Sequence, residues 1–378
     1  MTDLSLDLEA PLRPHALTAQ LGTYPWTSVT TLLRVAHSLG LIHPTKSWRK
    51  LSWKPFLTIG VVLTMLLYNV PYYLVYFFNR GDWTFAHHGT SLLLTFILLL
   101  NVAPILTFSC VSTMLSGDTT EVTHLLSGLD DHPEHSEQDF RRSCRNALAW
   151  TVVLGALYIL WGTLEIFTTA FSLPAKILFG LLMVTFPMRL LLPLLGVTLF
   201  ELTAFGQMAA LRQFRDLHRG QVNVTTLAQA LRIVVRQQIA IEQQWSLLYF
   251  TLLVIPYLCL VASVFCAITV SLQAKVPHLW FFACYTTYSL YLSSLVLWYG
   301  SRLTAFTEEV ARDIQTRIAC GDVSFSHLKH IQMDAYLGML RSLRGFVIFG
   351  IPITYRIFTT ILGMLIPIVI LALTYSFG

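Results

Sequence analysis

The sequence predicts an all-α fold, that of a polytopic membrane protein with seven transmembrane helices and a helical anchor domain in the cytoplasm. Apolar residues make up 55% of the 378-residue chain and charged residues only 12%. A soluble domain of this length does not need so apolar a composition to bury its core. The apolar residues gather into long runs, and most of the basic residues lie between alternate runs.

Seven apolar runs reach the roughly 20 residues that a helix needs to cross a bilayer. They cover residues 55–78, 90–115, 147–171, 177–203, 246–271, 279–299 and 345–374. Only residues 172–176 separate the third run from the fourth. These two runs are therefore predicted to form a tight helical hairpin.

The basic residues predict the orientation, because loops rich in lysine and arginine resist translocation. With the N-terminus inside, 20 of the 25 lysine and arginine residues fall on the cytoplasmic side and three fall outside. The remaining two, Arg189 and Arg356, lie within runs. We therefore expect a multi-pass protein of the cell membrane with an extracellular C-terminus. The net charge of +5 follows from this bias, so no nucleic-acid partner is expected.

Two short segments precede the first run. Residues 1–28 are polar and rich in Pro, Thr and Asp, which predicts a disordered cytoplasmic N-terminus without a signal peptide. Residues 29–54 predict a helix on the inner membrane surface. Its apolar residues between Leu32 and Leu41 share one face, and Trp48 and Trp53 follow among lysines and arginines.

The cytoplasmic loop of residues 116–145 contains the group Asp130–His135, whose side chains are mostly acidic or histidine. Its spacing differs from that of paired metal ligands, and Pro133 interrupts it, so we expect a solvated loop and no metal. No set of catalytic residues stands on facing helices, so neither an enzyme nor a cofactor is expected. The six cysteines lie in the runs or on the inner side, which predicts no extracellular disulfides.

The fourth, fifth and sixth runs are predicted to continue as helices into the cytoplasm. Apolar residues recur at helical spacing over 211–217, 227–245 and 303–318, and a further helix is expected over 326–344. Residues 55–344 would then form a six-span bundle, with its anchor at about 204–245 and 300–344. Nothing in one bundle obviously covers these apolar stripes, so we expect a packing domain shared between subunits.

Two stretches of the sequence, together with this layout, resemble the insect gustatory receptor family. Leu32–Pro44, LLRVAHSLGLIHP, is similar to the family's segment of a hydrophobic residue, Arg, x, Leu-Gly-Leu, x and Pro before the first span. Leu343–Phe349, LRGFVIF, is similar to the Gly-hydrophobic-Phe pattern at the start of the family's final helix. The resemblance implies a ligand-gated, non-selective cation channel that is a homotetramer. Four final helices would line one pore.

The resemblance also implies an outward-facing pocket for a tastant, such as a sugar or a bitter compound, in the outer halves of spans two to six. Aromatic side chains with a polar tip suit small polar ligands. The charges of Glu165 and Arg189 would be paired within the membrane or would line the pocket. The pocket candidates are His88, Thr95, Tyr158, Trp161, Glu165, Arg189, Trp280, Tyr285 and Tyr288.

Residues 345–378 are expected to form the C-terminal helix that lines the pore. This run carries a single charge, Arg356, and four copies around an axis would oppose cations and favour anions. Near the outer end, bulky residues suit a constriction that closes by excluding water. The pore candidates are Arg356, Leu362, Ile366, Ile370 and Leu371.

Three alternatives stay open. A non-conducting membrane protein of the same fold is one, because Arg356 lies in the last run and Gly363–Leu371 lacks the family's closing Thr-Tyr and Gln-Phe residues. A G-protein-coupled receptor also has seven spans, but its Asp-Arg-Tyr and Asn-Pro-x-x-Tyr motifs do not occur in the matching runs, and the basic residues demand the opposite orientation. A membrane enzyme or transporter fits less well, since no inverted repeat is evident.

Overall fold

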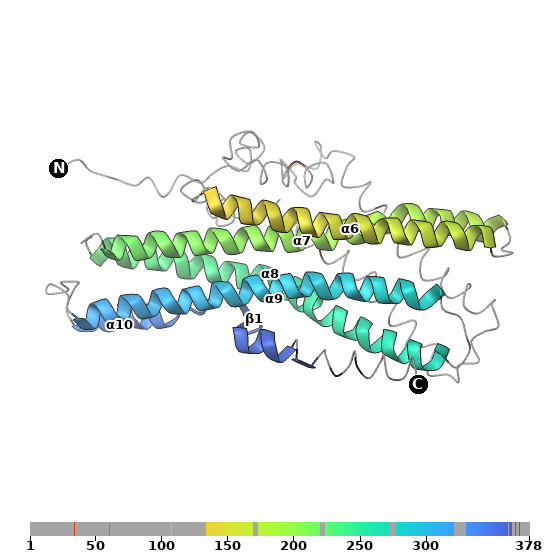
Figure 1. Cartoon of the computed structure of the whole chain (residues 1–378). Helices are drawn as coiled ribbons and strands as arrows, with labels where there is room; N and C mark the ends of the chain where they lie inside the picture. The colour runs from red at the N-terminus through yellow and green to blue at the C-terminus, as the bar shows by residue number, and fades with distance from the viewer. Residues whose placement is uncertain are drawn as a thin grey trace.

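The computed structural model of this protein is helical in the residues that it describes, and these include a short hairpin of strands (Figure 1). It describes residues 34, 60, 107, 134–168, 173–219, 224–271, 277–320, 330–361, 363, 364, 367 and 370. The predicted disordered N-terminus and surface helix lie almost wholly outside these residues, as do the first two predicted spans. The described elements are α6 (Glu134–Thr168), α7 (Leu173–Arg219), α8 (Val224–Ser271), α9 (Pro277–Cys320), α10 (His330–Arg341), β1 (Val347–Ile348) and β2 (Ile351–Pro352).

Helices α7, α8 and α9 are far longer than a membrane crossing. They contain 47, 48 and 44 residues, which at about 1.5 Å per residue gives roughly 65–72 Å against a hydrocarbon core of about 30 Å. The sequence contains signals for the boundaries of these helices. Gly220 and Gly321 directly follow α7 and α9, and Asn223 directly precedes α8.

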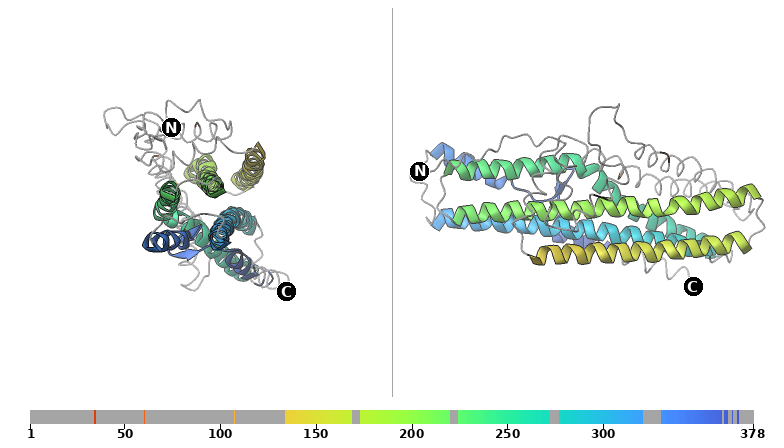
Figure 2. Two further views of the ribbon diagram at one scale, coloured as in Figure 1. Left: turned by 90° about the vertical axis from the view of Figure 1, so that its left-hand side faces the viewer. Right: turned by 90° about the horizontal axis from the view of Figure 1, so that it is seen from above.

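The helices pack as a bundle elongated along one axis (Figures 1 and 2). The end of α7, the start of α8, the end of α9 and α10 all lie at one end of this bundle, which we call the inner end. Two ion pairs join α7 to α9 there, Arg215 to Glu309 at 3.6 Å and Arg219 to Asp313 at 3.7 Å. The residue number rises by four on both helices from the first ion pair to the second. Helices α7 and α9 therefore run in the same direction, towards the inner end.

The apolar stripes of the predicted extensions form the core of one chain. The residues that share this burial come from α7, α8 and α9, and they are Leu211, Phe214, Leu227, Leu231, Val234, Ile241, Leu303, Val310 and Ile314, all 6% exposed or less. Leu217 is the exception, with 37% of its surface exposed. These stripes are therefore covered within one subunit, whereas Ile233 and Ile239 of α8 stay exposed, at 40% and 49%. A packing domain shared between subunits stays a prediction.

The surface of α6 changes character along its length. Near its start the exposed side chains include Arg141, Arg142 and Arg145. Beyond them, large apolar side chains are exposed instead, with Leu148 at 50%, Val152 at 61% and others up to Phe167 at 82%. So much exposed apolar surface on one helix is typical of a face that contacts lipid. The change from charged to apolar lies near residues 145–148, where the sequence predicts the cytoplasmic edge of the third span.

Within the described residues, one stretch, Leu190–Arg219, is long and apolar enough to cross a membrane, and 94% of its most apolar window is buried. Four charged residues, Arg212, Arg215, Asp216 and Arg219, lie in its last turns and mark that end as extramembrane. The predicted third, fifth and sixth spans are almost entirely helical in backbone, although many of their side chains fall outside the described set.

The predicted second span contacts this stretch through Thr107, which is fully buried. A Cβ added to Gly196 of α7 would lie 2.9 Å from Thr107 Cγ2 and 3.6 Å from Leu248 Cδ2 of α8. The absence of a side chain at Gly196 therefore allows three helices to approach one another closely, as small residues do in membrane bundles.

Helix α10 is attached to the inner end of the bundle by a buried hydrogen bond between His218 Nε2 and the Tyr336 hydroxyl. The two side chains are 4% and 2% exposed. The ring of Phe214 meets the imidazole edge-on at 5.3 Å between centroids. Burial lowers the pKa of His218 to about 4, and the positive charge of Arg317 adds to this effect against the opposing charge of Asp313. His218 is therefore neutral at physiological pH.

Acidification should destabilise the protein through His218. An unfolded histidine gains its proton near pH 6.5, whereas the folded His218 stays neutral down to about pH 4. Its contribution is therefore complete above about pH 6.5 and is lost as the pH falls towards 4. We expect the melting temperature in detergent to fall less over this range in His218→Gln than in the wild type. Tyr336→Phe, which keeps the imidazole, should retain the wild-type slope, and equal slopes for the wild type and His218→Gln would contradict this assignment.

Candidate functional site

The junction between α10 and the last helix is the candidate functional site, because it attaches the predicted pore-lining segment to the bundle. The sequence predicted a helix from about Gly345. In the structure β1 and β2 pair instead, with Val347 opposite Pro352 and Ile348 opposite Ile351. The Ile353 amide donates to the Phe346 carbonyl at 2.9 Å, and helical residues begin only at Tyr355.

The backbone angles explain this difference. Gly345, Phe349 and Gly350 have φ values of +69°, +48° and +82°. These angles belong to the left-handed region, which an α-helix cannot contain and which glycine adopts most readily. Pro352 also lacks an amide proton for a helical hydrogen bond. The first ten residues of the apolar run are therefore a turn and a hairpin that precede the helix.

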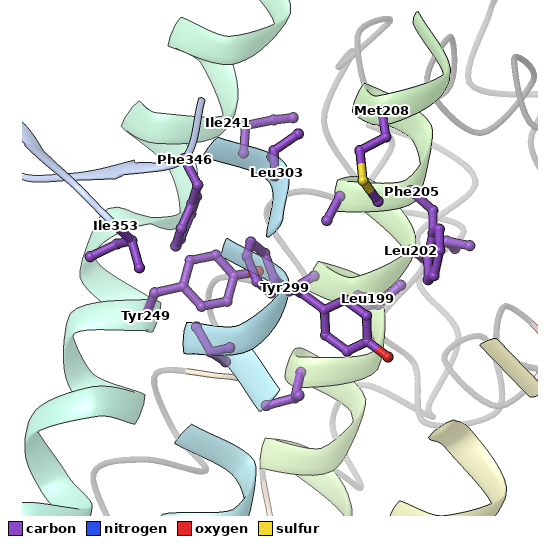
Figure 3. Close-up of a cluster of buried hydrophobic side chains, with 14 of the residues drawn as sticks. Leu199, Leu202, Phe205, Met208, Ile241, Tyr249, Tyr299, Leu303, Phe346 and Ile353 are labelled. Carbon is purple, nitrogen blue, oxygen red and sulfur yellow. The ribbon is translucent and has the colours of Figure 1, made fainter. Parts of the chain in front are cut away.

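Phe346 is inserted between three helices (Figure 3). It is 3% exposed, and its ring centroid lies 4.6 Å from that of Phe200 on α7 and 5.5 Å from that of Tyr249 on α8. The third wall is α9, where a Cβ on Gly300 would lie 2.4 Å from Phe346 Cδ1. Gly300 therefore leaves the space that the phenyl ring fills.

Thr304 of α9 holds the backbone of the same junction. The Phe346 amide donates to Thr304 Oγ1 at 3.1 Å, and this hydroxyl donates to the Gly300 carbonyl at 3.0 Å. A Cβ on Gly345 would lie 2.5 Å from the Thr304 Cα. The chain at Gly345 thus passes directly against the backbone of α9, so the pair Gly345-Phe346 in the sequence motif has a steric role.

The last helix follows α9 beyond the junction. The indole of Trp298 meets the rings of Tyr355 and Phe358 edge-on, at 5.8 and 6.0 Å between centroids. The opposite face of this helix is open, because Arg356 is exposed and forms no ion pair with the described residues. Ile370 is also exposed, at 57%. The other pore candidates, Leu362, Ile366 and Leu371, lie outside the described residues.

Among the pocket candidates, the structure describes only the side chain of Tyr288. It is 2% exposed, donates to the Leu190 carbonyl at 2.7 Å and accepts from Thr151 Oγ1 at 3.2 Å. Tyr288 therefore ties α9 to α7 and α6. Six other candidates lie in helices whose backbone is described, although their side chains are not. They are Tyr158, Trp161 and Glu165 in α6, Arg189 in α7, and Trp280 and Tyr285 in α9. His88 and Thr95 lie outside it altogether.

The sequence reading missed one buried acidic residue, Glu201 of α7, which is 1% exposed. Ser143 Oγ of α6 donates to its Oε2 at 3.0 Å, and its Oε1 has no hydrogen-bond partner among the described residues. Tyr299 of α9 lies beside the same carboxyl group. No group of three or more His, Cys, Asp or Glu residues in the described part of the chain is placed to hold a metal. The signal available was one acidic residue at the inner end of an apolar run.

The sequence matches no family model and no curated protein. Solved structures nevertheless share the fold, among them the insect olfactory receptor OR5 from Machilis hrabei, with a TM-score of 0.61 over 96% of this chain and 98% of that one. The structure of the same receptor in complex with eugenol gives 0.60 over 91% and 96%. Both are 11% identical to this chain. The chain therefore has the fold of an insect olfactory receptor along nearly its whole length.

A methyl group at Gly345 should disrupt the junction. Gly345→Ala places a Cβ against the Thr304 backbone in a left-handed residue, so we expect a loss of about 1–3 kcal/mol in unfolding free energy. Gly350→Ala is the matched control, because its φ is also positive but nothing lies within 4 Å of the added Cβ. It should cost only the backbone strain, about 1 kcal/mol. Chemical denaturation of both variants measures the difference, and equal losses would exclude a steric role for Gly345.

Proposed function

We propose that this protein is a chemosensory ion channel of the cell membrane, opened by a small molecule. The observation that carries the proposal is the fold match to the insect olfactory receptor OR5, which covers 96% of this chain and 98% of that receptor. One structure of that receptor is a complex with eugenol. The match is therefore to the receptor fold as a whole and not to one part of it.

The junction supports a channel because it connects the helices of the predicted pocket to the predicted pore. The pocket candidates Trp280, Tyr285 and Tyr288 and the junction residues Gly300 and Thr304 lie on one continuous helix, α9. A ligand that shifts the outer half of α9 would therefore also shift the contacts of Phe346 and of the last helix. Coupling through such a packed element is the physical form that gating takes in many proteins.

The open face of the last helix supports a pore between several subunits. Arg356, Met364 and Ile370 are exposed on it in one subunit. We propose a homotetramer with four copies of this helix around one axis, and a ligand pocket of the gustatory kind in the outer half of each subunit. Tastants such as sugars and bitter compounds are the ligands suggested by the gustatory resemblance, and small aromatic molecules are the ligands suggested by the eugenol complex.

Arg356 favours a second candidate, a non-conducting protein of the same fold. It is exposed and has no acidic partner among the described residues, and four such charges at a pore axis would repel cations. In the channel, Arg356 would face water at the inner mouth or a neighbouring subunit. Its replacement separates the two candidates.

Voltage-clamp recording in a cell without native receptors tests this function. We expect eugenol, a sugar panel or a bitter panel to evoke current in the wild type. Arg356→Gln should raise the permeability to cations relative to anions if the residue borders the pore. Arg341→Gln removes the same charge from the exposed surface of α10 and should leave permeability unchanged. Absence of current with every ligand, despite labelling of the protein at the cell surface, would support the non-conducting candidate.

The orientation has an independent test at Asn223-Val224-Thr225, a glycosylation acceptor by sequence. It lies between α7 and α8 at the inner end, so we expect it to stay unmodified in a eukaryotic cell. An acceptor introduced within residues 79–89, between the first two predicted spans on the predicted outer side, should be glycosylated and provides the positive control. A mass shift on glycosidase treatment of the wild type would reverse the topology and favour the receptor class that couples to G proteins.

A further inference from the structure

We propose that three arginines at the inner end of the bundle bind the phosphorylated headgroup of an anionic phospholipid. They are Arg212 and Arg215, which contact the ring of Phe306, and Arg302, whose charge acts on Arg212. The site combines guanidinium groups from α7 and α9 at the inner edge of the membrane. It lies apart from the predicted pocket and pore. It depends on the orientation of the chain and not on conduction.

The aromatic ring of Phe306 brings two of the guanidinium groups together. Arg212 Cζ lies 5.5 Å and Arg215 Cζ 5.7 Å from the ring centroid. Arg302 stands one helical turn before Phe306 on α9, on the same side of that helix. All four side chains are half-buried. An aromatic platform that orients arginine side chains in this way presents their hydrogen-bond donors together.

Positive charge at this site exceeds negative charge. Arg215 pairs with Glu309 at 3.6 Å, but this carboxylate is 68% exposed, so solvent weakens the pair. Neither Arg212 nor Arg302 forms an ion pair within the described part of the chain. Burial lowers the pKa of Arg212, and the charges of Arg215 and Arg302 lower it further, with only Asp216 opposing them. Arg215 Nε is buried with no described hydrogen-bond partner. An anion would relieve this repulsion.

Landmarks on α6, α7 and α9 place the site close to the predicted membrane edge, on its cytoplasmic side. Arg302 follows the end of the predicted sixth span by three residues and Arg212 follows the end of the fourth by nine, roughly 5 and 14 Å at 1.5 Å per residue. On α6, the exposed surface becomes apolar at Leu148. Ser143, five residues earlier on α6, bonds to Glu201 of α7 and so relates this level to α7. Side chains on a helix lean towards its N-terminus, which for α7 and α9 is the membrane side. The guanidinium groups therefore extend towards the headgroup layer.

The chemistry of the site favours a phosphorylated headgroup. Guanidinium groups bind phosphate oxygens in pairs through charge-assisted hydrogen bonds. Three guanidinium groups match a headgroup with several phosphate groups better than they match phosphatidylserine, whose serine adds one carboxylate. Anionic lipids concentrate in the cytoplasmic leaflet, and the lipid tails would meet the exposed apolar face of α6. A phosphoinositide headgroup satisfies all of these conditions.

Lipid binding to the purified full chain in detergent tests the proposal without any current. The probe is dioctanoyl phosphatidylinositol 4,5-bisphosphate, with binding followed by native mass spectrometry and by the melting temperature. We expect the lipid to bind and to raise the melting temperature. Arg212→Gln and Arg302→Gln should each weaken binding by about tenfold, and the double variant should weaken it further. Arg312→Gln is the matched control, since it removes the same charge from the exposed surface of α9, and it should bind like the wild type.

Two further ligands separate the possible sources of phosphate. Dioctanoyl phosphatidylcholine has the chains but no net charge, and inositol 1,4,5-trisphosphate has the phosphates but no chains. Weaker binding of both than of the phosphoinositide supports the lipid site. Equal binding of the phosphatidylcholine, equal binding of the soluble trisphosphate, or wild-type affinity in both single arginine variants would each overturn it. Melting temperatures without lipid show whether each variant is folded, and Arg302→Lys, which keeps the charge, should show intermediate affinity.

Discussion

The insertion of Phe346 between α7, α8 and α9 is the contact on which the C-terminal part of the structure depends. Its ring fills space that exists because residue 300 is glycine, and its amide is held by Thr304. Burial of a phenylalanine side chain contributes about 2–3 kcal/mol, and most of that depends on Gly345 allowing the chain to pass against α9. The hairpin and the last helix then follow from where this residue is fixed.

The same contact gives the last helix its position relative to the bundle. Beyond Phe346, the described attachments to α9 are the edge-on contacts of Tyr355 and Phe358 with Trp298. Helices α7 and α9 run in the same direction and are joined by ion pairs at the inner end and by Tyr288 nearer the outer end. Among the described residues, the bundle is fixed at both ends, whereas the attachments of the last helix lie near its start. Motion of the last helix is therefore expected to centre on Phe346.

The sequence predicted the long helices well and the junction poorly, for physical reasons. Gly220, Asn223 and Gly321 are strong end signals, and helical spacing correctly identified stripes such as Leu303, Val310 and Ile314. Spacing shows which residues share a face but not what covers that face, and here helices of the same chain cover most of it. Residues 345–353 are apolar throughout, and hydropathy alone does not distinguish a hairpin from a helix. The positive φ angles and the pairing of β1 with β2 distinguish the hairpin from a helix. The predicted pocket lies mostly among side chains outside the described set.

Charge and apolar surface agree on the level of the inner membrane edge, although they come from different helices. On α6 the exposed surface turns apolar at Leu148, and on α9 the first arginine after the sixth apolar run is Arg302. Glu201 on α7 lies at this level and bonds to Ser143 of α6, which precedes the apolar face. In a soluble bundle nothing would align these changes, since each helix would place its charges independently. Their alignment follows if one planar boundary between lipid and water acts on all three helices.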